Sequence, residues 1–213
     1  MNINKHLILL FSVLFFLFAI SVSSGCFRKN ESDVKSVVRN ELDQLKNLDS
    51  ETTQKYIPYT ELFPDATENT DLTDEINETF SLFFRKFNYK ISDVIVGTAN
   101  HSATVSVKLT TIDSKVLARD FKAELLRTQI TESAQAQKGN IKDSSRSLEA
   151  HYLILNHLLN TNDYDTAETD CNIQLVNTGN NKKEKWKIQR TNSLEDDLVG
   201  GLIADLADPD ILS

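Results

Sequence analysis

Two stretches in which apolar and polar residues strictly alternate most constrain what this chain can fold into. Every second residue is apolar in residues 103–109, and again in residues 171–175. Neighbouring side chains of a strand point to opposite faces of a sheet, so this period predicts half-buried strands. Strands joined by short turns form hairpins, which build antiparallel sheets. The predicted hairpins are residues 90–97 with 103–111 through a turn at 98–101, and 167–175 with 186–188 through a turn at 179–181.

Elsewhere, apolar residues recur every three or four positions, the spacing of helices with one buried face. Phe80, Phe83, Phe84 and Phe87 form an aromatic stripe of this kind, which either belongs to the core or lines a ligand pocket. Gly200-Gly201 would cost a continuous helix about 1 kcal/mol per glycine relative to alanine, which indicates close packing or a break. Five helices are predicted. They run from Ser32 or Asp33 to near Leu48, from within 70–73 to near Phe87, from after Asp113 to near Ile130, from Leu148 to near Asn160, and from Ser193 to near Leu206.

The order of these elements is helix, helix, hairpin, helix, helix, hairpin, short helix. It predicts a single α+β domain over residues 32–213, with a curved antiparallel sheet of two hairpins packed against helices on one face. Pro58 and Pro64 bracket an irregular connection between the first two helices. No repeat indicates a solenoid or a second domain.

The segment before residue 26 has the pattern of an export signal. Lys5 gives a positive start, residues 7–20 are apolar apart from Ser12, and small residues lead to Gly25. This order is typical of signal peptides. The apolar core is also shorter than the roughly 20 residues that a spanning helix needs. We therefore expect residues 1–25 to be a cleaved signal peptide, the alternative being an uncleaved anchor helix.

Cys26 directly after Gly25 sharpens this prediction. The run Val22-Ser23-Ser24-Gly25-Cys26 resembles the lipobox of bacterial lipoproteins. That resemblance implies cleavage between Gly25 and Cys26, a diacylglyceryl group bearing acyl chains such as palmitate on the Cys26 sulfur, and an extracytoplasmic position on the cell membrane. The position three before the cysteine is usually Leu, Val or Ile in that family and is Ser23 here. Secretory cleavage after Ser23, leaving a free thiol, is the alternative.

Residues 26–31 form the predicted lipidated tether. Residues 27–31 span only about 15 Å when fully extended, so the domain is expected close to the membrane. Arg28 and Lys29 each gain about 1 kcal/mol near an anionic surface. Membrane lipid, held through Cys26, is thus the first partner that the sequence predicts.

Composition excludes several classes of function. The formal net charge is −8, which argues against a nucleic-acid partner because neutralising phosphates needs clustered Lys and Arg. With Cys26 lipidated, Cys171 has no disulfide partner and is expected to be buried as a small hydrophobe. Two cysteines provide no zinc or iron–sulfur signal, and no glycine-rich loop cradles a phosphate, so we expect no metal and no cofactor.

Two blocks of the chain resemble a known family. Residues 89–125 and 166–202, the latter with Lys185-Trp186-Lys187-Ile188, resemble small lipoproteins of Gram-positive bacteria that carry a domain of unknown function. Those domains are similar to the nuclear-transport-factor-two-like, or cystatin-like, fold, in which a curved sheet wraps around helices and often forms a cone-shaped cavity. The resemblance implies this fold but no particular activity, because such domains host enzymes, carriers and interaction modules.

Enzymes of that fold usually place an Asp, His or Tyr inside the cone. Asp120, His151 and Tyr152 are the speculative cavity residues here, with Asp120 a conceivable buried base. The plainer interpretations are a surface carboxylate for Asp120 and a solvated or packing role for His151. No catalytic triad or HExxH motif accompanies them.

Three hypotheses for function follow. The first is a non-enzymatic binding or interaction module that holds a small apolar ligand or an envelope protein. The second is a cone-cavity enzyme, such as an isomerase or dehydratase, with a buried Asp or His. The third is an accessory subunit of an envelope complex.

Overall fold

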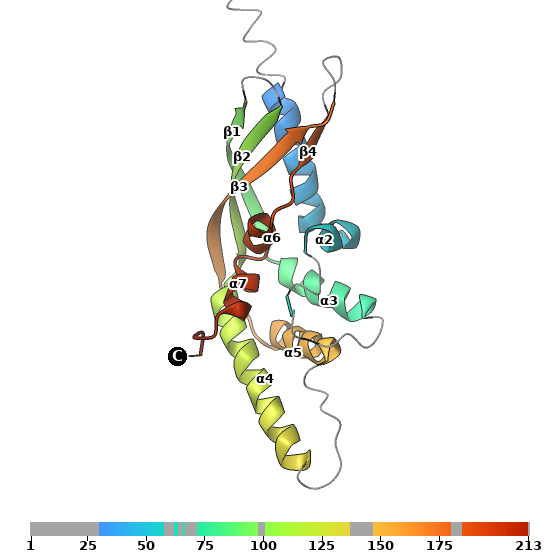
Figure 1. The fold of residues 1–213 in the computed structure, drawn as a ribbon, viewed down its shortest axis with the longest axis vertical. Helices are drawn as coiled ribbons and strands as arrows, with labels where there is room; N and C mark the ends of the chain where they lie inside the picture. Colours follow the sequence, from blue (N-terminus) through green and yellow to red (C-terminus); the bar gives the residue numbers. More distant parts are fainter. Residues whose placement is uncertain are drawn as a thin grey trace, which may run out of the picture.

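The computed structural model describes residues 30–57, 62–63, 66, 72–97, 101–136, 147–179 and 185–212 (Figure 1). The signal segment, Cys26 and the predicted turns at 98–100 and 180–181 lie outside them. No helix within the described ranges combines the length and apolar character that a membrane span requires. The elements are a helix over residues 30–46, α2 (Ser50–Tyr56), α3 (Thr73–Phe84), β1 (Asn88–Val96), β2 (Ser102–Ile112), α4 (Ser114–Ala136), α5 (Leu148–Thr161), β3 (Thr166–Asn177), β4 (Trp186–Ile188), α6 (Asn192–Leu198) and α7 (Leu202–Ala207).

The four strands form one open antiparallel sheet in the order β1-β2-β3-β4, which confirms the α+β class and both predicted hairpins. β2 and β3 are the central pair and stay in register from Ser102↔Val176 to Ile112↔Thr166. Val105 and Leu109 of β2 are fully buried on one face of the sheet. The alternation in β2 therefore places one complete face of the central strand in the core.

The opposite face of the sheet is polar. Thr104 Oγ1 donates to Gln174 Oε1 at 2.9 Å, and Ser106 Oγ donates to Asn172 Oδ1 at 2.9 Å. Lys108 Nζ lies 3.3 Å from an Asp170 oxygen. Such cross-strand polar pairs suit a face in contact with water. The buried side chains of β2 and β3 lie on the other, apolar face and belong to the core.

A bulge in β1 keeps its apolar residues on the core side. The register shifts between Ile91 and Asp93, so that Ile91 faces Val107 and Val94 faces Val105. Ile91 and Val94 are three positions apart, and only an extra residue allows both to point inward. Ile95 consequently faces outward and is 60% exposed.

The helix over residues 30–46 packs its apolar stripe on the core, with Val34, Val38 and Leu45 fully buried. The expected continuation to Leu48 is wrong, because Leu48 lies beyond the helix at φ 62° and is 43% exposed. α2 follows at once, with its first turn capped by the Asp49 carboxylate, which accepts from Thr52 N at 2.8 Å. This short helix was not expected from the spacing of apolar residues.

The aromatic stripe of α3 belongs to the core. Phe80, Phe83, Phe84 and Phe87 are each 1–4% exposed, and Phe84 makes edge contacts with Phe83 and Phe87 at 5.4 Å. α4 runs to Ala136, beyond the predicted end at Ile130, and no residue from 122 to 135 is buried. Figure 1 shows this part of α4 extending away from the sheet.

The C-terminal segment forms two helices instead of the single helix predicted. α6 is capped by Thr191, whose side chain accepts from Leu194 N at 3.1 Å; the predicted cap, Ser193, lies inside the helix. Gly200 and Gly201, at φ 66° and 90°, make the break. The Ser114 hydroxyl lies 2.6 Å from Gly200 O and 2.7 Å from an Asp205 oxygen, which ties this turn to the start of α4.

The two glycines allow a direct test of this junction. A Cβ on Gly200 would lie 2.2 Å from Thr111 Oγ1, whereas one on Gly201 would meet nothing closer than 3.7 Å. We expect Gly200→Ala to lower the free energy of unfolding by about 2–4 kcal/mol and Gly201→Ala by about 1 kcal/mol, measured by urea denaturation.

A double-mutant cycle separates collision from backbone strain. Among the described residues the Thr111 hydroxyl has no hydrogen-bond partner, so Thr111→Ala removes the colliding atom without breaking a bond. Thr111→Ala should therefore recover part of the loss caused by Gly200→Ala. Strictly additive effects would contradict the proposed contact.

Candidate functional site

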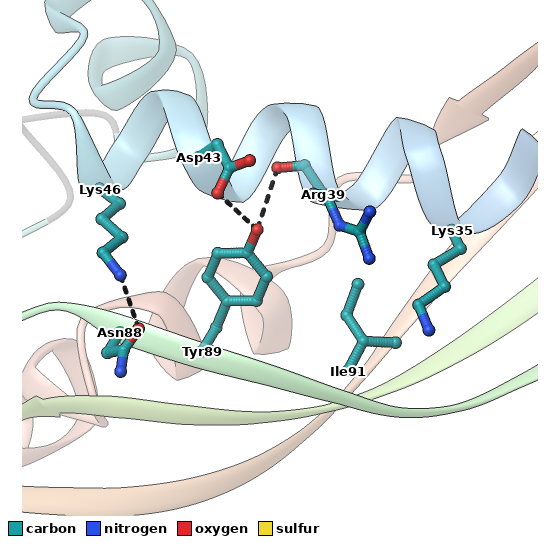
Figure 2. A pocket seen from close by; sticks show the side chains of 7 residues that line it. All are labelled: Lys35, Arg39, Asp43, Lys46, Asn88, Tyr89 and Ile91. Carbon is teal, nitrogen blue, oxygen red and sulfur yellow. Dashed lines mark hydrogen bonds between the residues drawn. The ribbon is translucent and has the colours of Figure 1, made fainter.

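A polar groove lies between the helix over residues 30–46 and strand β1 (Figure 2). Its volume is about 310 Å³, at the lower end of the range for small-molecule sites. Three cationic side chains and one carboxylate line it. The lining residues are Lys35, Arg39, Asp43, Lys46, Asn88, Tyr89 and Ile91.

The helix places its cations on one stripe beside the buried face. Lys35, Arg39 and Lys46 are at i, i+4 and i+11, which share one side of a helix of 3.6 residues per turn. The alternate residues Tyr89 and Ile91 of β1 supply the opposite wall. In Figure 2 the Lys35 and Arg39 head groups both extend toward Ile91.

Tyr89 binds Asp43, the one carboxylate among the described residues that line the groove. Its hydroxyl donates to Asp43 Oδ1 at 2.6 Å and lies 3.4 Å from the Arg39 carbonyl oxygen. Burial, together with the hydrogen bond and the negative charge of Asp43, raises the pKa of Tyr89 to about 12. The tyrosine is therefore a neutral donor over the physiological range.

The cations of the groove differ in their partners. Lys46 Nζ donates to Asn88 Oδ1 at 2.8 Å. For the side chains of Lys35 and Arg39, the structure gives no hydrogen bond or ion pair with any described residue. Lys35 is half-buried and Arg39 is exposed. These two charges are the ones available to a ligand.

A second groove, of about 440 Å³, lies where α4 begins and the C-terminal segment ends. It also contains a lysine and an arginine four residues apart, Lys115 and Arg119, but three carboxylates accompany them. The carboxylates are Asp113, Asp208 and Asp210. Both grooves thus have a lysine and an arginine four residues apart, but the first groove is net positive and the second net negative.

The structure does not bring the speculative cavity residues together into a site. Asp120, about one third exposed, lies 3.3 Å from Arg119 and accepts from the Tyr164 hydroxyl at 3.2 Å. Tyr152 is fully buried, with its ring edge-on to Phe63 at 5.3 Å. Neither described groove includes either residue.

His151 lies at the edge of the same aromatic cluster as Tyr152. Its ring contacts Phe63 at 5.0 Å and Phe121 at 5.7 Å, and its Nδ1 lies 2.7 Å from the Ser147 carbonyl oxygen. These contacts fit the packing role considered for it. None of these contacts joins His151 to Asp120.

Cys171 is buried, as expected for a lone cysteine. Burial, together with the neighbouring Asp197 carboxylate, raises the pKa of the thiol to about 12, so it is unreactive at neutral pH. Within the described ranges no cluster of His, Cys, Asp or Glu has the geometry of a metal site.

Sequence reasoning missed the groove. The signal was the cation stripe at 35, 39 and 46, which flanks the apolar stripe of the same helix. A stripe of this kind is usually a solvated surface. This stripe differs because β1, more than forty residues later in the sequence, packs beside it and places Tyr89 against Asp43.

No family model, curated protein or solved structure matches this chain. Function is therefore inferred from the groove and the packing around it.

The hydrogen bond between Tyr89 and Asp43 predicts a cost for its removal. Tyr89→Phe should lower the free energy of unfolding by about 1–2 kcal/mol at pH 7, because it deletes a hydrogen bond to a charged group. Urea denaturation measures this. Tyr164→Phe is the comparison variant. It deletes a 3.2 Å bond to Asp120 and a 3.3 Å bond from Asn162 Nδ2, and should cost less because both bonds are longer. Equal losses would contradict the importance of the groove contact.

The raised pKa of Tyr89 predicts an alkaline loss of stability. In the unfolded chain the tyrosine loses its proton near pH 10, whereas in the folded chain it keeps the proton to about pH 12. The folded state thus holds more protons in this window, and the free energy of unfolding falls as pH rises from 10 to 12. Tyr89→Phe should flatten this fall in urea denaturation measured across the window. An unchanged slope would contradict the assignment.

Proposed function

We propose that this chain is a lipid-anchored extracytoplasmic protein whose domain is a non-enzymatic binding or interaction module. The observation that carries the proposal is that the charged side chains lie in a surface groove, whereas the interior is filled with apolar and aromatic side chains. Large side chains such as Phe83, Phe84 and Tyr152 fill the described core at 0–2% exposure. Charged side chains gather instead in the surface groove beside β1. That arrangement favours recognition at the surface over chemistry in a cavity.

The position of the first helix supports a membrane-proximal domain. The structure describes helix from residue 30, four residues after Cys26. Four residues span at most about 14 Å, so lipid on Cys26 would hold this helix close to the bilayer. Arg28 and Lys29 fall within the same short segment.

The finer fold type that we propose is the cystatin-like, or nuclear-transport-factor-two-like, arrangement. A helix against one face of an open antiparallel sheet supports it (Figure 1). In a cone-cavity enzyme a polar group would face an open interior, whereas here the alternate residues Val105, Val107 and Leu109 pack on apolar side chains. This packing favours an interaction role over an isomerase or dehydratase, and over storage of an apolar ligand.

A role as accessory subunit of an envelope complex has its own support. Leu126 and Ile130 of α4 are 49% and 61% exposed, on the part of the helix that extends from the sheet. The two side chains are four positions apart, so they share one side of the helix and form a small exposed apolar surface that a protein partner could cover. This second candidate shares the anchor with the first and differs only in the surface used.

Lipidation is tested with the full chain in a bacterial host fed an alkyne-bearing fatty acid. We expect the native chain and Cys171→Ala to carry the label and Cys26→Ala to carry none. Cys171→Ala is the matched control because it removes the other cysteine. The label is a better measurement than membrane fractionation, because an uncleaved apolar signal on Cys26→Ala would itself hold the chain at the membrane.

Two outcomes would contradict the anchor. One is label on Cys26→Ala. The other is a native chain whose N-terminus, by mass spectrometry, is an unmodified Ser24, which would indicate secretory cleavage after Ser23.

A further inference from the structure

We infer that the groove between the helix over residues 30–46 and β1 binds a phosphomonoester group through Lys35 and Arg39. This phosphate site specifies the ligand of the binding role proposed above and rests on that proposal. It does not depend on the lipid anchor. The phosphate belongs either to a soluble molecule or to a lipid headgroup, and the experiment below separates these sources.

The first argument is that Lys35 and Arg39 stay unpaired at a cost. They are four positions apart on one helix, so their like charges destabilise it. The structure gives neither side chain a hydrogen bond or ion pair among the described residues, and Glu31, one turn before Lys35, does not line the groove. An anion between the two head groups would remove this repulsion.

The second argument is the geometry of Asp43. Arg39 and Asp43 have the i, i+4 spacing at which opposite charges commonly pair. Asp43 instead accepts the Tyr89 hydroxyl at 2.6 Å, and Figure 2 shows its carboxylate turned to Tyr89 while the Arg39 head group extends toward Ile91. Tyr89 of β1 therefore holds the Asp43 carboxylate in an orientation in which no described residue forms an ion pair with the Arg39 guanidinium, which can bind an external anion.

The third argument is the contrast with the second groove. Lys115 and Arg119 repeat the spacing of Lys35 and Arg39, but three carboxylates line that groove against one in the first. Although the net charge of the chain is −8, cations outnumber carboxylates in the first groove and not in the second. Selective anion binding requires this kind of local excess.

The ligand chemistry follows from charge and shape. A phosphomonoester carries a charge of about −1.5 to −2 at pH 7, which matches the groove's three cations and one carboxylate. The planar guanidinium of Arg39 suits two phosphate oxygens, and the Lys35 ammonium supplies a point charge. The partly buried side chain of Ile91 offers an apolar contact to the group that bears the phosphate.

The test uses the full chain purified in a non-ionic detergent and titrated with inorganic phosphate at constant ionic strength. Affinity is measured from the phosphorus NMR signal of the added phosphate, which is present for every variant. The side-chain nitrogen NMR signal of Arg39, identified by its loss in Arg39→Gln, shows whether phosphate binds at the groove. We expect Lys35→Gln/Arg39→Gln to weaken binding about tenfold or more. Lys115→Gln/Arg119→Gln, which removes the same two charge types from the other groove, should change the Kd less than about twofold.

Tyr89→Phe gives an independent variant that leaves both cations in place. It frees Asp43 to pair with Arg39, so phosphate affinity should fall although the net charge of the groove is unchanged. Circular dichroism confirms that each variant is folded before its titration.

A second arm distinguishes the sources of phosphate. The full chain is placed in nanodiscs of phosphatidylcholine alone, or with a third of the lipid replaced by phosphatidic acid. If headgroups occupy the groove, the Arg39 signal shifts in the second disc and inorganic phosphate no longer moves it. If the ligand is soluble, phosphate moves the signal equally in both discs. Both outcomes support the phosphate site.

Two results would overturn the inference. The first is an Arg39 signal that no phosphate-bearing probe moves in detergent or in either disc, although the chain is folded. The second is equal weakening of phosphate binding by the two double variants, which would reduce the effect to general charge. Fatty-acid labelling of Cys26 is unaffected in either case, so a failed phosphate site and a failed anchor remain distinguishable.

Discussion

Burial of one face of β2 is the constraint on which the rest of this structure depends. The pair formed by β2 and β3 holds register over eleven residues, and a slip by one would move every core side chain of β3 to the polar face. The two strands are separated in sequence by α4 and α5, so these helices must return the chain to the sheet before β3 can pair. The bulge in β1 serves the same constraint, because it keeps Ile91 and Val94 on the buried face.

Local patterns were enough to predict most of this arrangement. The period of two in residues 103–109 reports directly on which side chains are buried, and the paired hairpins make the sheet antiparallel without knowledge of tertiary contacts. The apolar stripe of α5 likewise determines both its position and its buried side, with Tyr152 and Leu155 in the core. These predictions succeeded because each depends on periodicity within a single element.

The predictions that failed depend on contacts between elements. The helix over residues 30–46 stops before Leu48 because α2 begins immediately with its own cap at Asp49, a competition that an apolar spacing cannot reveal. The sequence indicated a break or close packing at Gly200, but the reason for it, contact with Thr111, requires β2 to be in place. The groove is of the same kind: three of its seven lining residues come from β1, and no local pattern joins Tyr89 to Asp43.

The helix over residues 30–46 combines a position near the proposed anchor with both the core stripe and the cation stripe. Along its axis Lys35 lies about 7.5 Å and Lys46 about 24 Å from residue 30, at 1.5 Å per residue. With Cys26 in the bilayer, Lys35 and Arg39 would be at the end of the groove nearer to the tether, and Lys46 at the farther end. Lys46 is the cation already bound within the chain, to Asn88. The free positive charge is therefore concentrated on the part of the groove closest to the proposed anchor, where a headgroup or a ligand held near the membrane surface would meet it first.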